Sequence, residues 1–189
     1  MDDYIARFAM KITETALEGV VILEPQLIKD ARGWFMESWS MAKLQDAGLN
    51  YNFVQDNHSY SKECGVLRGI HFQKEPMAQA KLVRCIQGAV LDVAVDLRKN
   101  SPTFKKWVSV ELSAINKRQL LIPRGFGHGF VTLTPNVEFV YKTDNPYSPS
   151  HDCTIHYLDP DLAIDWGVAQ PILSEKDKAA PNLCEGLVV

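Results

Sequence analysis

Apolar and β-branched residues recur along the chain in short runs that are separated by turn-forming residues. Runs of this length and composition predict strands rather than helices. Asn100-Ser101-Pro102, Thr134-Pro135-Asn136 and Ser148-Pro149-Ser150 lie between runs and favour chain reversals. The predicted strands span residues 19–28, 33–39, 52–59, 65–72, 80–88, 89–97, 106–113, 119–123, 127–134 and 136–144.

Helical signals are confined to two places. In residues 40–48, Ser40 can cap a helix and Gly48 can end it. A second short helix is predicted after residues 174–180, near the C-terminus. Many short strands with so little helix predict an all-β protein, an antiparallel jelly-roll sandwich that leaves a pocket between its sheets.

Composition supports a single globular unit. The chain has 189 residues, of which 46% are hydrophobic and 23% charged, enough to bury a core without covalent staples. The sequence contains no Pro/Gly-rich linker, low-complexity tract or fixed-period repeat. We therefore expect one domain over residues 1–189, in which 1–9 form an N-terminal extension because Met10 is an equally natural start.

Charge and cysteine usage exclude several classes of protein. A net charge of −3 gives no overall basic field, so nucleic acid is not an expected partner. No apolar run approaches the roughly 18 residues of a membrane span, and the acidic N-terminus does not resemble a signal peptide. The four cysteines form neither a CxxC pair nor a disulfide framework, which favours reduced thiols in a cytoplasmic protein.

Two neighbouring predicted strands carry several polar residues in an otherwise apolar pattern. Side chains alternate along a strand, so Lys81 and Arg84 must face opposite sides of the sheet. The same rule separates His71 from Arg68, unless Gly69 marks a bulge that turns the arginine toward the histidine. The pattern alone leaves both arrangements open.

A second motif follows a predicted turn. Pro123, Gly125 and His128 form PxGxxH, which in jelly-roll proteins of the cupin class usually supplies a metal-binding histidine. The usual partner motif, HxH followed by glutamate, is missing around His71, and Lys81 stands where a ligand is expected. A protein-bound divalent ion needs three or four neutral or anionic ligands. The sequence therefore predicts a pocket without metal.

Five ordered segments carry a resemblance that covers nearly the whole chain after residue 15. They are FVQDNHSYSKECGVLRGIHFQ, AKLVRCIQGAVLDVAVDLRKNSPTF, SAINKRQLLIPRGFGHGFVTL, VEFVYK and PILSEKDKAAP. In these segments the chain resembles the dTDP-4-dehydrorhamnose 3,5-epimerase family. The resemblance implies a cupin-like jelly roll, usually a homodimer, that uses no cofactor and inverts carbons 3 and 5 of a dTDP-linked 4-keto-6-deoxyhexose.

The resemblance also implies catalytic roles. His71 becomes the general base, Asp177 the carboxylate that orients it, Tyr141 the proton donor on the opposite face of the sugar, and Lys81 the cation beside the developing enolate. These roles make chemical sense. A proton on carbon next to a ketone is weakly acidic, so its removal needs a positioned base and a donor or positive charge at the oxygen.

Further residues are implied as substrate contacts. Arginine and lysine suit the diphosphate, and aromatic rings suit the base or the sugar. The implied contacts are Arg32, Phe35, Glu37, Gln55, Asn57, Arg68, His128, Tyr147, Asp152 and Lys176. Pro146 stands where family members often have an additional aromatic ring, which leaves the preference for the nucleobase open.

The leading hypothesis is conversion of dTDP-4-dehydro-6-deoxy-D-glucose to dTDP-4-dehydro-L-rhamnose through an enolate that is reprotonated on its other face. Three alternatives remain. A 3-only or 5-only epimerase would keep the same catalytic residues. A metal-dependent cupin enzyme would need an ion at His71 and His128, and a sugar-nucleotide sensor would bind without catalysis.

Overall fold

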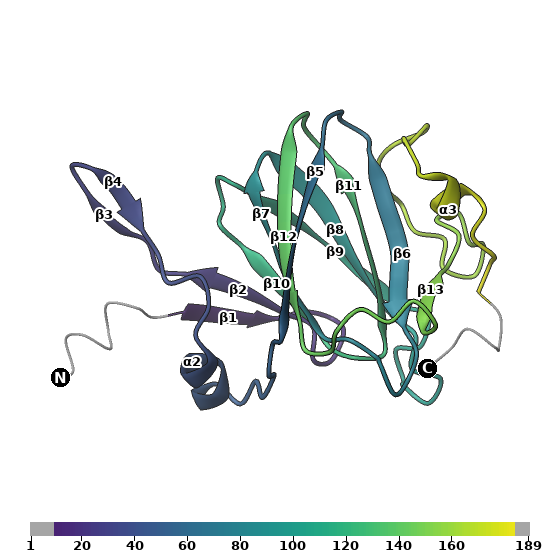
Figure 1. Cartoon of the computed structure of the whole chain (residues 1–189), viewed down its shortest axis with the longest axis horizontal. Helices are drawn as coiled ribbons and strands as arrows, with labels where there is room; N and C mark the ends of the chain where they lie inside the picture. Colours follow the sequence, from purple (N-terminus) through teal and green to yellow (C-terminus); the bar gives the residue numbers. More distant parts are fainter. Residues whose placement is uncertain (1–9, 184–189) are drawn as a thin grey trace.

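The computed structural model describes residues 10–183, which form two facing β-sheets (Figure 1). All strand pairs in the first, six-stranded sheet are antiparallel. In spatial order its strands are β1 (Met10–Glu14), β2 (Val21–Pro25), β10 (Gln119–Ile122), β7 (Lys81–Gln87), β12 (Val137–Thr143) and β5 (Gln55–Ser61).

The second sheet has five strands and is also antiparallel throughout. Its strands, in spatial order, are β13 (Asp152–Thr154), β6 (Leu67–Gln73), β11 (Phe126–Thr132), β8 (Ala89–Asp96) and β9 (Trp107–Ser113). The arrangement confirms the predicted all-β, cupin-like jelly-roll sandwich. Residues 1–9, the predicted extension, lie outside the described residues.

Alternating side chains build a core on each side of the sheets. Between the sheets, Phe130 of β11 stacks on Phe139 of β12 with ring centroids 4.3 Å apart. Behind the five-stranded sheet, Trp166 and Ile155 cover outward-facing residues such as Ile70. Offset aromatic stacking and dense apolar burial hold the two layers together.

The two helices are short. α2 (Met41–Asp46) falls inside the predicted segment and buries Leu44 against the outer face of the six-stranded sheet. α3 (Glu175–Lys178) corrects the second prediction, because the helix lies within residues 174–180 rather than after them. Ser174 caps its N-terminus directly. No helix among residues 10–183 is long and apolar enough to cross a membrane.

One predicted strand, 19–28, is divided in the structure. β2 ends at Pro25, and the chain then enters a separate hairpin of β3 (Ile28–Asp30) and β4 (Gly33–Phe35). Proline has no backbone N–H to continue a ladder, which agrees with a strand that ends there. We call residues 28–35 the arm, since the hairpin projects away from the sandwich (Figure 1). The short strands β1 and β13 were not predicted.

Candidate active site

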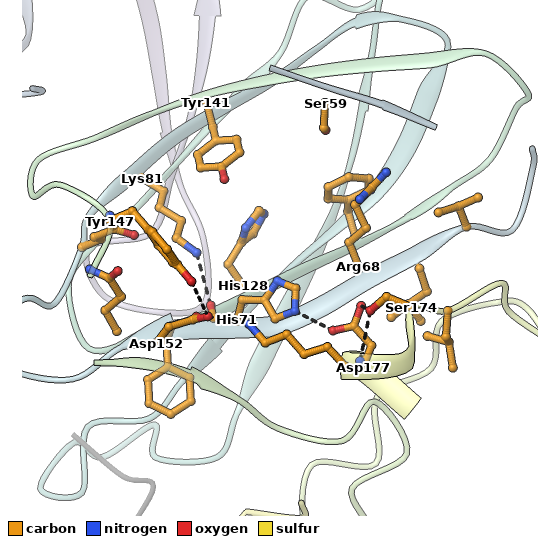
Figure 2. Close-up of a pocket in the computed structure, with 18 of the residues that line it drawn as sticks. Ser59, Arg68, His71, Lys81, His128, Tyr141, Tyr147, Asp152, Ser174 and Asp177 are labelled. Atoms are coloured by element: carbon orange, nitrogen blue, oxygen red, sulfur yellow. Dashed lines mark hydrogen bonds and ion pairs between the residues drawn. The ribbon is translucent and has the colours of Figure 1, made fainter. Parts of the chain in front are cut away.

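A cavity of about 510 Å³ opens between the two sheets, and residues from β5, β6, β7, β11, β12 and the C-terminal segment line it (Figure 2). Its size is within the ordinary range for small-molecule sites. The four residues predicted to be catalytic all reach it. Nine predicted site residues line the cavity: Arg68, His71, Lys81, His128, Tyr141, Tyr147, Asp152, Lys176 and Asp177.

His71 and Asp177 lie within ion-pair distance of each other at one wall of the cavity. His71 Nε2 lies 2.6 Å from Asp177 Oδ1, and the aspartate is only 3% exposed. Burial pushes the pKa of Asp177 upward, but the hydrogen bond and charge of His71, together with Ser174 and Lys176, outweigh it and lower the pKa. An ionised Asp177 fixes one ring nitrogen of His71 and leaves the other to accept a proton.

The backbone explains how two residues 106 positions apart meet. Leu67 N donates to Ile172 O at 3.0 Å, and Ile172 N donates to Gly65 O at 2.8 Å, so the C-terminal segment is tied to the start of β6. The chain then turns through α3, which places Asp177 over β6 beside His71. Sequence spacing contains no signal for this contact.

A β-bulge in β6 resolves the parity conflict between Arg68 and His71. His128 pairs with His71, and Phe130 pairs with Arg68. Between these two pairs β11 has one residue, Gly129, whereas β6 has two, Gly69 and Ile70. The extra residue turns Arg68 inward, and both side chains line the cavity. The second parity prediction is also confirmed, since Lys81 lines the cavity while Arg84 lies on the other face of its sheet.

Lys81 is a buried cation beside the histidine. Its Nζ donates a hydrogen bond of 3.2 Å to the backbone oxygen of His71, and the residue is 7% exposed. Burial lowers the pKa of Lys81 from 10.5 to about 8, although the charges of Asp92 and Asp152 oppose the shift. The group is therefore mostly an ammonium at neutral pH and titrates just above it.

His128 has a buried partner that the sequence reading missed. Its Nε2 lies 2.9 Å from Asp92 Oδ2, and both residues are buried. Burial lowers the pKa of His128, with Lys81 and His71 adding to the shift and Asp92 opposing it. An aspartate at an inward position of the apolar strand AVLDVAVD was the available signal, because a buried carboxylate needs a partner.

Tyr141 approaches from the other sheet. It belongs to β12, whereas His71 belongs to β6, and the two side chains enter the cavity from facing walls (Figure 2). Burial raises the pKa of the Tyr141 phenol. The phenol is therefore neutral at physiological pH and retains a proton that it can donate.

The rim of the cavity holds a small polar cluster. Tyr147 Oη and Lys176 Nζ both donate to Asp152 Oδ2, at 3.2 and 2.5 Å. The charge of Asp152 raises the pKa of Tyr147. Gln55 and Asn57 lie behind this rim: Gln55 accepts from Tyr147 N and donates to Asn57 Oδ1, both at 2.9 Å. Neither of these two side chains lines the cavity itself.

Three more predicted contacts, besides Gln55 and Asn57, do not line the cavity. Arg32 and Phe35 lie on the arm, and Glu37 follows it closely. The Arg32 side chain is 90% exposed and pairs with Asp30, two residues earlier, while the ring of Phe35 is largely exposed. Within one chain, none of these three residues lines the cavity that holds His71 and Tyr141.

The cavity offers a poor ligand set for a metal ion. Within residues 10–183 no group of three or more histidine, cysteine, aspartate or glutamate side chains is arranged to hold one. His71 and His128 are each paired with an aspartate, and the ammonium of Lys81 lies beside them. The positive charge of Lys81 would repel a metal cation bound between the two histidines.

Comparison with known proteins identifies the family. The family model described as dTDP-4-dehydrorhamnose 3,5-epimerase matches residues 14–185. The chain belongs to this family. A dTDP-4-dehydrorhamnose 3,5-epimerase from Shigella flexneri is 54% identical over 169 residues, which cover 89% of this chain and 93% of the relative.

Solved structures of the epimerase family agree with the fold. The enzyme from Bacillus anthracis, with TDP and pyrophosphate bound, has a TM-score of 0.91 at 52% identity and covers 93% of this chain and all of its own. A dTDP-6-deoxy-D-glucose-3,5-epimerase from Legionella pneumophila, in complex with dTDP-4-keto-L-rhamnose, has a TM-score of 0.88 at 47% identity, with 92% and 93% coverage. The chain therefore has an epimerase-family fold over almost its full length.

Proposed function

We propose that this chain converts dTDP-4-dehydro-6-deoxy-D-glucose to dTDP-4-dehydro-L-rhamnose by inverting carbons 3 and 5. The observation that carries the proposal is the position of His71 and Tyr141 on facing walls of one cavity. Inversion requires that a proton leave one face of a carbon and that another arrive on the opposite face. A base on one sheet and an acid on the other meet this requirement.

In the proposed mechanism, His71 removes the proton from the carbon next to the ketone. Asp177 stabilises the imidazolium that forms and fixes its orientation. The negative charge moves to the ketone oxygen, where the buried ammonium of Lys81 stabilises the enolate. Tyr141 then donates its proton from the opposite face. Solvent takes up the proton from the His71 imidazolium and returns one to Tyr141, so the same cycle can act on the second carbon.

The nucleotide is proposed to bind along the rim of the cavity and beside Arg68, which lines it. Arg68 is held there by Ser61 Oγ and Tyr60 O, at 3.2 and 3.1 Å, and offers its remaining donors to a diphosphate. Lys176 supplies a second positive charge at the rim, and Tyr147 an exposed aromatic ring. His128 and Asp152 remain proposed contacts of the sugar and the rim.

A homodimer would explain the residues that lie outside the cavity. We propose that the arm of one subunit reaches the cavity of its partner, where Arg32, Phe35 and Glu37 complete the nucleotide site. An exposed guanidinium and an exposed aromatic ring on a projecting hairpin support this arrangement. We also propose that the enzyme works in the cytoplasm, because its cysteines follow no disulfide pattern.

The number of carbons inverted can be tested directly. In deuterated water the purified chain should incorporate deuterium at both carbon 3 and carbon 5 of dTDP-4-dehydro-6-deoxy-D-glucose, as read by NMR. Incorporation at one carbon alone would replace the proposal with a single-site epimerase. A reaction that stops after exhaustive chelation and returns with added metal would instead favour the metal-dependent alternative.

A further inference from the structure

The segment that carries Asp177 depends on a very short helix. We call residues 172–178 the strap. Five of these residues line the cavity, and backbone hydrogen bonds tie Ile172 to the start of β6. Beyond Ile172 the only regular structure in the strap is the single turn of α3. One helical turn has little stability of its own, so the residue that caps it decides where Asp177 lies.

Ser174, the capping residue, contacts Asp177 twice. Ser174 Oγ accepts a hydrogen bond from the Asp177 backbone N–H at 3.1 Å and donates one to Asp177 Oδ2 at 2.9 Å. The other carboxylate oxygen, Oδ1, accepts from His71 Nε2 at 2.6 Å (Figure 2). Each oxygen of this buried carboxylate therefore has its own donor.

The arrangement at α3 is not a general feature of helix caps in this protein. Ser40 occupies the same position at α2, also with an extended backbone, and makes no side-chain capping hydrogen bond. Ser40 also lies outside the lining of the active-site cavity. The contrast points to a specific use of the hydroxyl of Ser174.

We propose that Ser174 is a positioning residue of the epimerase, whose hydroxyl fixes the Asp177 carboxylate in the orientation that aligns His71 for proton abstraction. The inference rests on the proposed function, since it assigns His71 the role of base. A carboxylate held at Oδ1 alone can rotate about its Cβ–Cγ bond, and the imidazole then loses its fixed direction. Removal of Ser174 also leaves Oδ2 buried without a donor.

Ser174 also contributes to the charge state of the pair. Its hydrogen bond is among the interactions that keep the pKa of Asp177 low in spite of burial. Loss of one hydrogen bond to a charged group should therefore slow proton abstraction about tenfold. The KM for the nucleotide sugar should stay unchanged, because the hydroxyl acts on the carboxylate of the catalytic pair.

The kinetic test compares three substitutions at Ser174. Ser174→Ala removes both the cap and the donor, whereas Ser174→Gly removes the donor and retains most of the capping preference. Both should lower kcat about tenfold by loss of the charged hydrogen bond. Ser174→Thr, which keeps the hydroxyl, should restore most of the rate. Ser40→Ala is the matched control and should leave kcat and KM unchanged.

A second measurement needs no substrate. The Nε2–H proton of His71, hydrogen-bonded to Asp177, should give a low-field NMR resonance in the free protein that moves upfield and broadens in Ser174→Gly but not in Ser174→Thr. If the wild-type chain does not epimerise the sugar, the proposed function fails while this resonance still tests Ser174. An unchanged resonance together with an unchanged kcat in Ser174→Gly would overturn the inference.

Discussion

At the scale of single residues, the site depends on charges that are buried next to one another. Lys81 is the clearest example, because burial brings its pKa to about 8 and so close to the working pH. The same side chain is proposed to stabilise the enolate, which requires its charged form. We therefore expect its environment to limit both the activity and the stability of the protein.

The activity should fall on the alkaline side as Lys81 loses its proton. Above a pH of about 8, kcat/KM should decrease roughly tenfold per pH unit. Lys81→Arg should show a lower rate with no such alkaline limb, since arginine keeps its proton beyond pH 12. The pH–rate profiles of the two proteins measure this, and an alkaline limb at the same pH in Lys81→Arg would assign it to another group.

The contribution of Lys81 to the stability of the folded protein should increase over the same alkaline pH range in which the activity falls. A lysine whose folded pKa lies near 8 rather than 10.5 destabilises the folded state below pH 8, by roughly 3 kcal/mol. This cost disappears as the pH rises from about 8 to above 10.5. Lys81→Met should therefore be inactive but more stable than wild type at pH 7 in urea denaturation, with the difference vanishing at high pH. A less stable Lys81→Met at pH 7 would contradict this reading.

At the scale of elements, much of the fold follows from local patterns. Alternation and turn residues predicted ten strands, and most of them lie close to the observed boundaries. The arm was predicted as parts of longer strands, because apolar periodicity does not show that a hairpin leaves the sandwich. The bulge at Gly69 was recognised only as an alternative, since a glycine in a strand fits either a regular or a bulged ladder.

The β-bulge in β6 can be tested by comparing alanine substitutions at two glycines. Gly69 and Gly33 share nearly the same backbone φ, +130° and +131°, but only Gly69 is crowded: a Cβ there would lie 2.5 Å from Gly129 Cα, whereas Gly33 has open space. Both alanine variants carry the same backbone strain, so any further loss reports the crowding. Gly69→Ala should have the lower midpoint in thermal denaturation and should lose affinity for dTDP, because Arg68 and His71 no longer share a face. Equal midpoints would show that the bulge tolerates a side chain.

At the scale of the whole molecule, contacts that are distant in sequence complete the site. Asp177 reaches His71 through backbone pairing of the strap, and Asp92 meets His128 across two neighbouring strands. Neither contact leaves a signal in spacing. The resemblance to the epimerase family supplied Asp177, but Asp92 and Ser174 emerged only from the coordinates. That residues 1–189 form a single domain stays a prediction.

The proposed dimer can be tested by complementation. A chain with Arg32→Ala and Phe35→Ala has an intact cavity and a defective arm, whereas His71→Ala has the reverse. Random exchange of equal amounts should place a working cavity and a working arm together in about a quarter of all sites. Epimerase activity should return to about a quarter of the wild-type value after the two inactive chains are mixed. No recovery, with subunit exchange verified, would contradict an arm that acts in the partner's cavity.

The central claim is that a base and an acid act from facing walls of one cavity, and solvent exchange tests it most directly. The His71→Ala and Tyr141→Phe variants would each be incubated with the 4-keto sugar in deuterated water, after their fold and dTDP binding are verified. We predict that His71→Ala incorporates no deuterium at carbons 3 and 5, whereas Tyr141→Phe still exchanges a proton but inverts much more slowly. Normal exchange in His71→Ala, or unaltered inversion in Tyr141→Phe, would contradict the account.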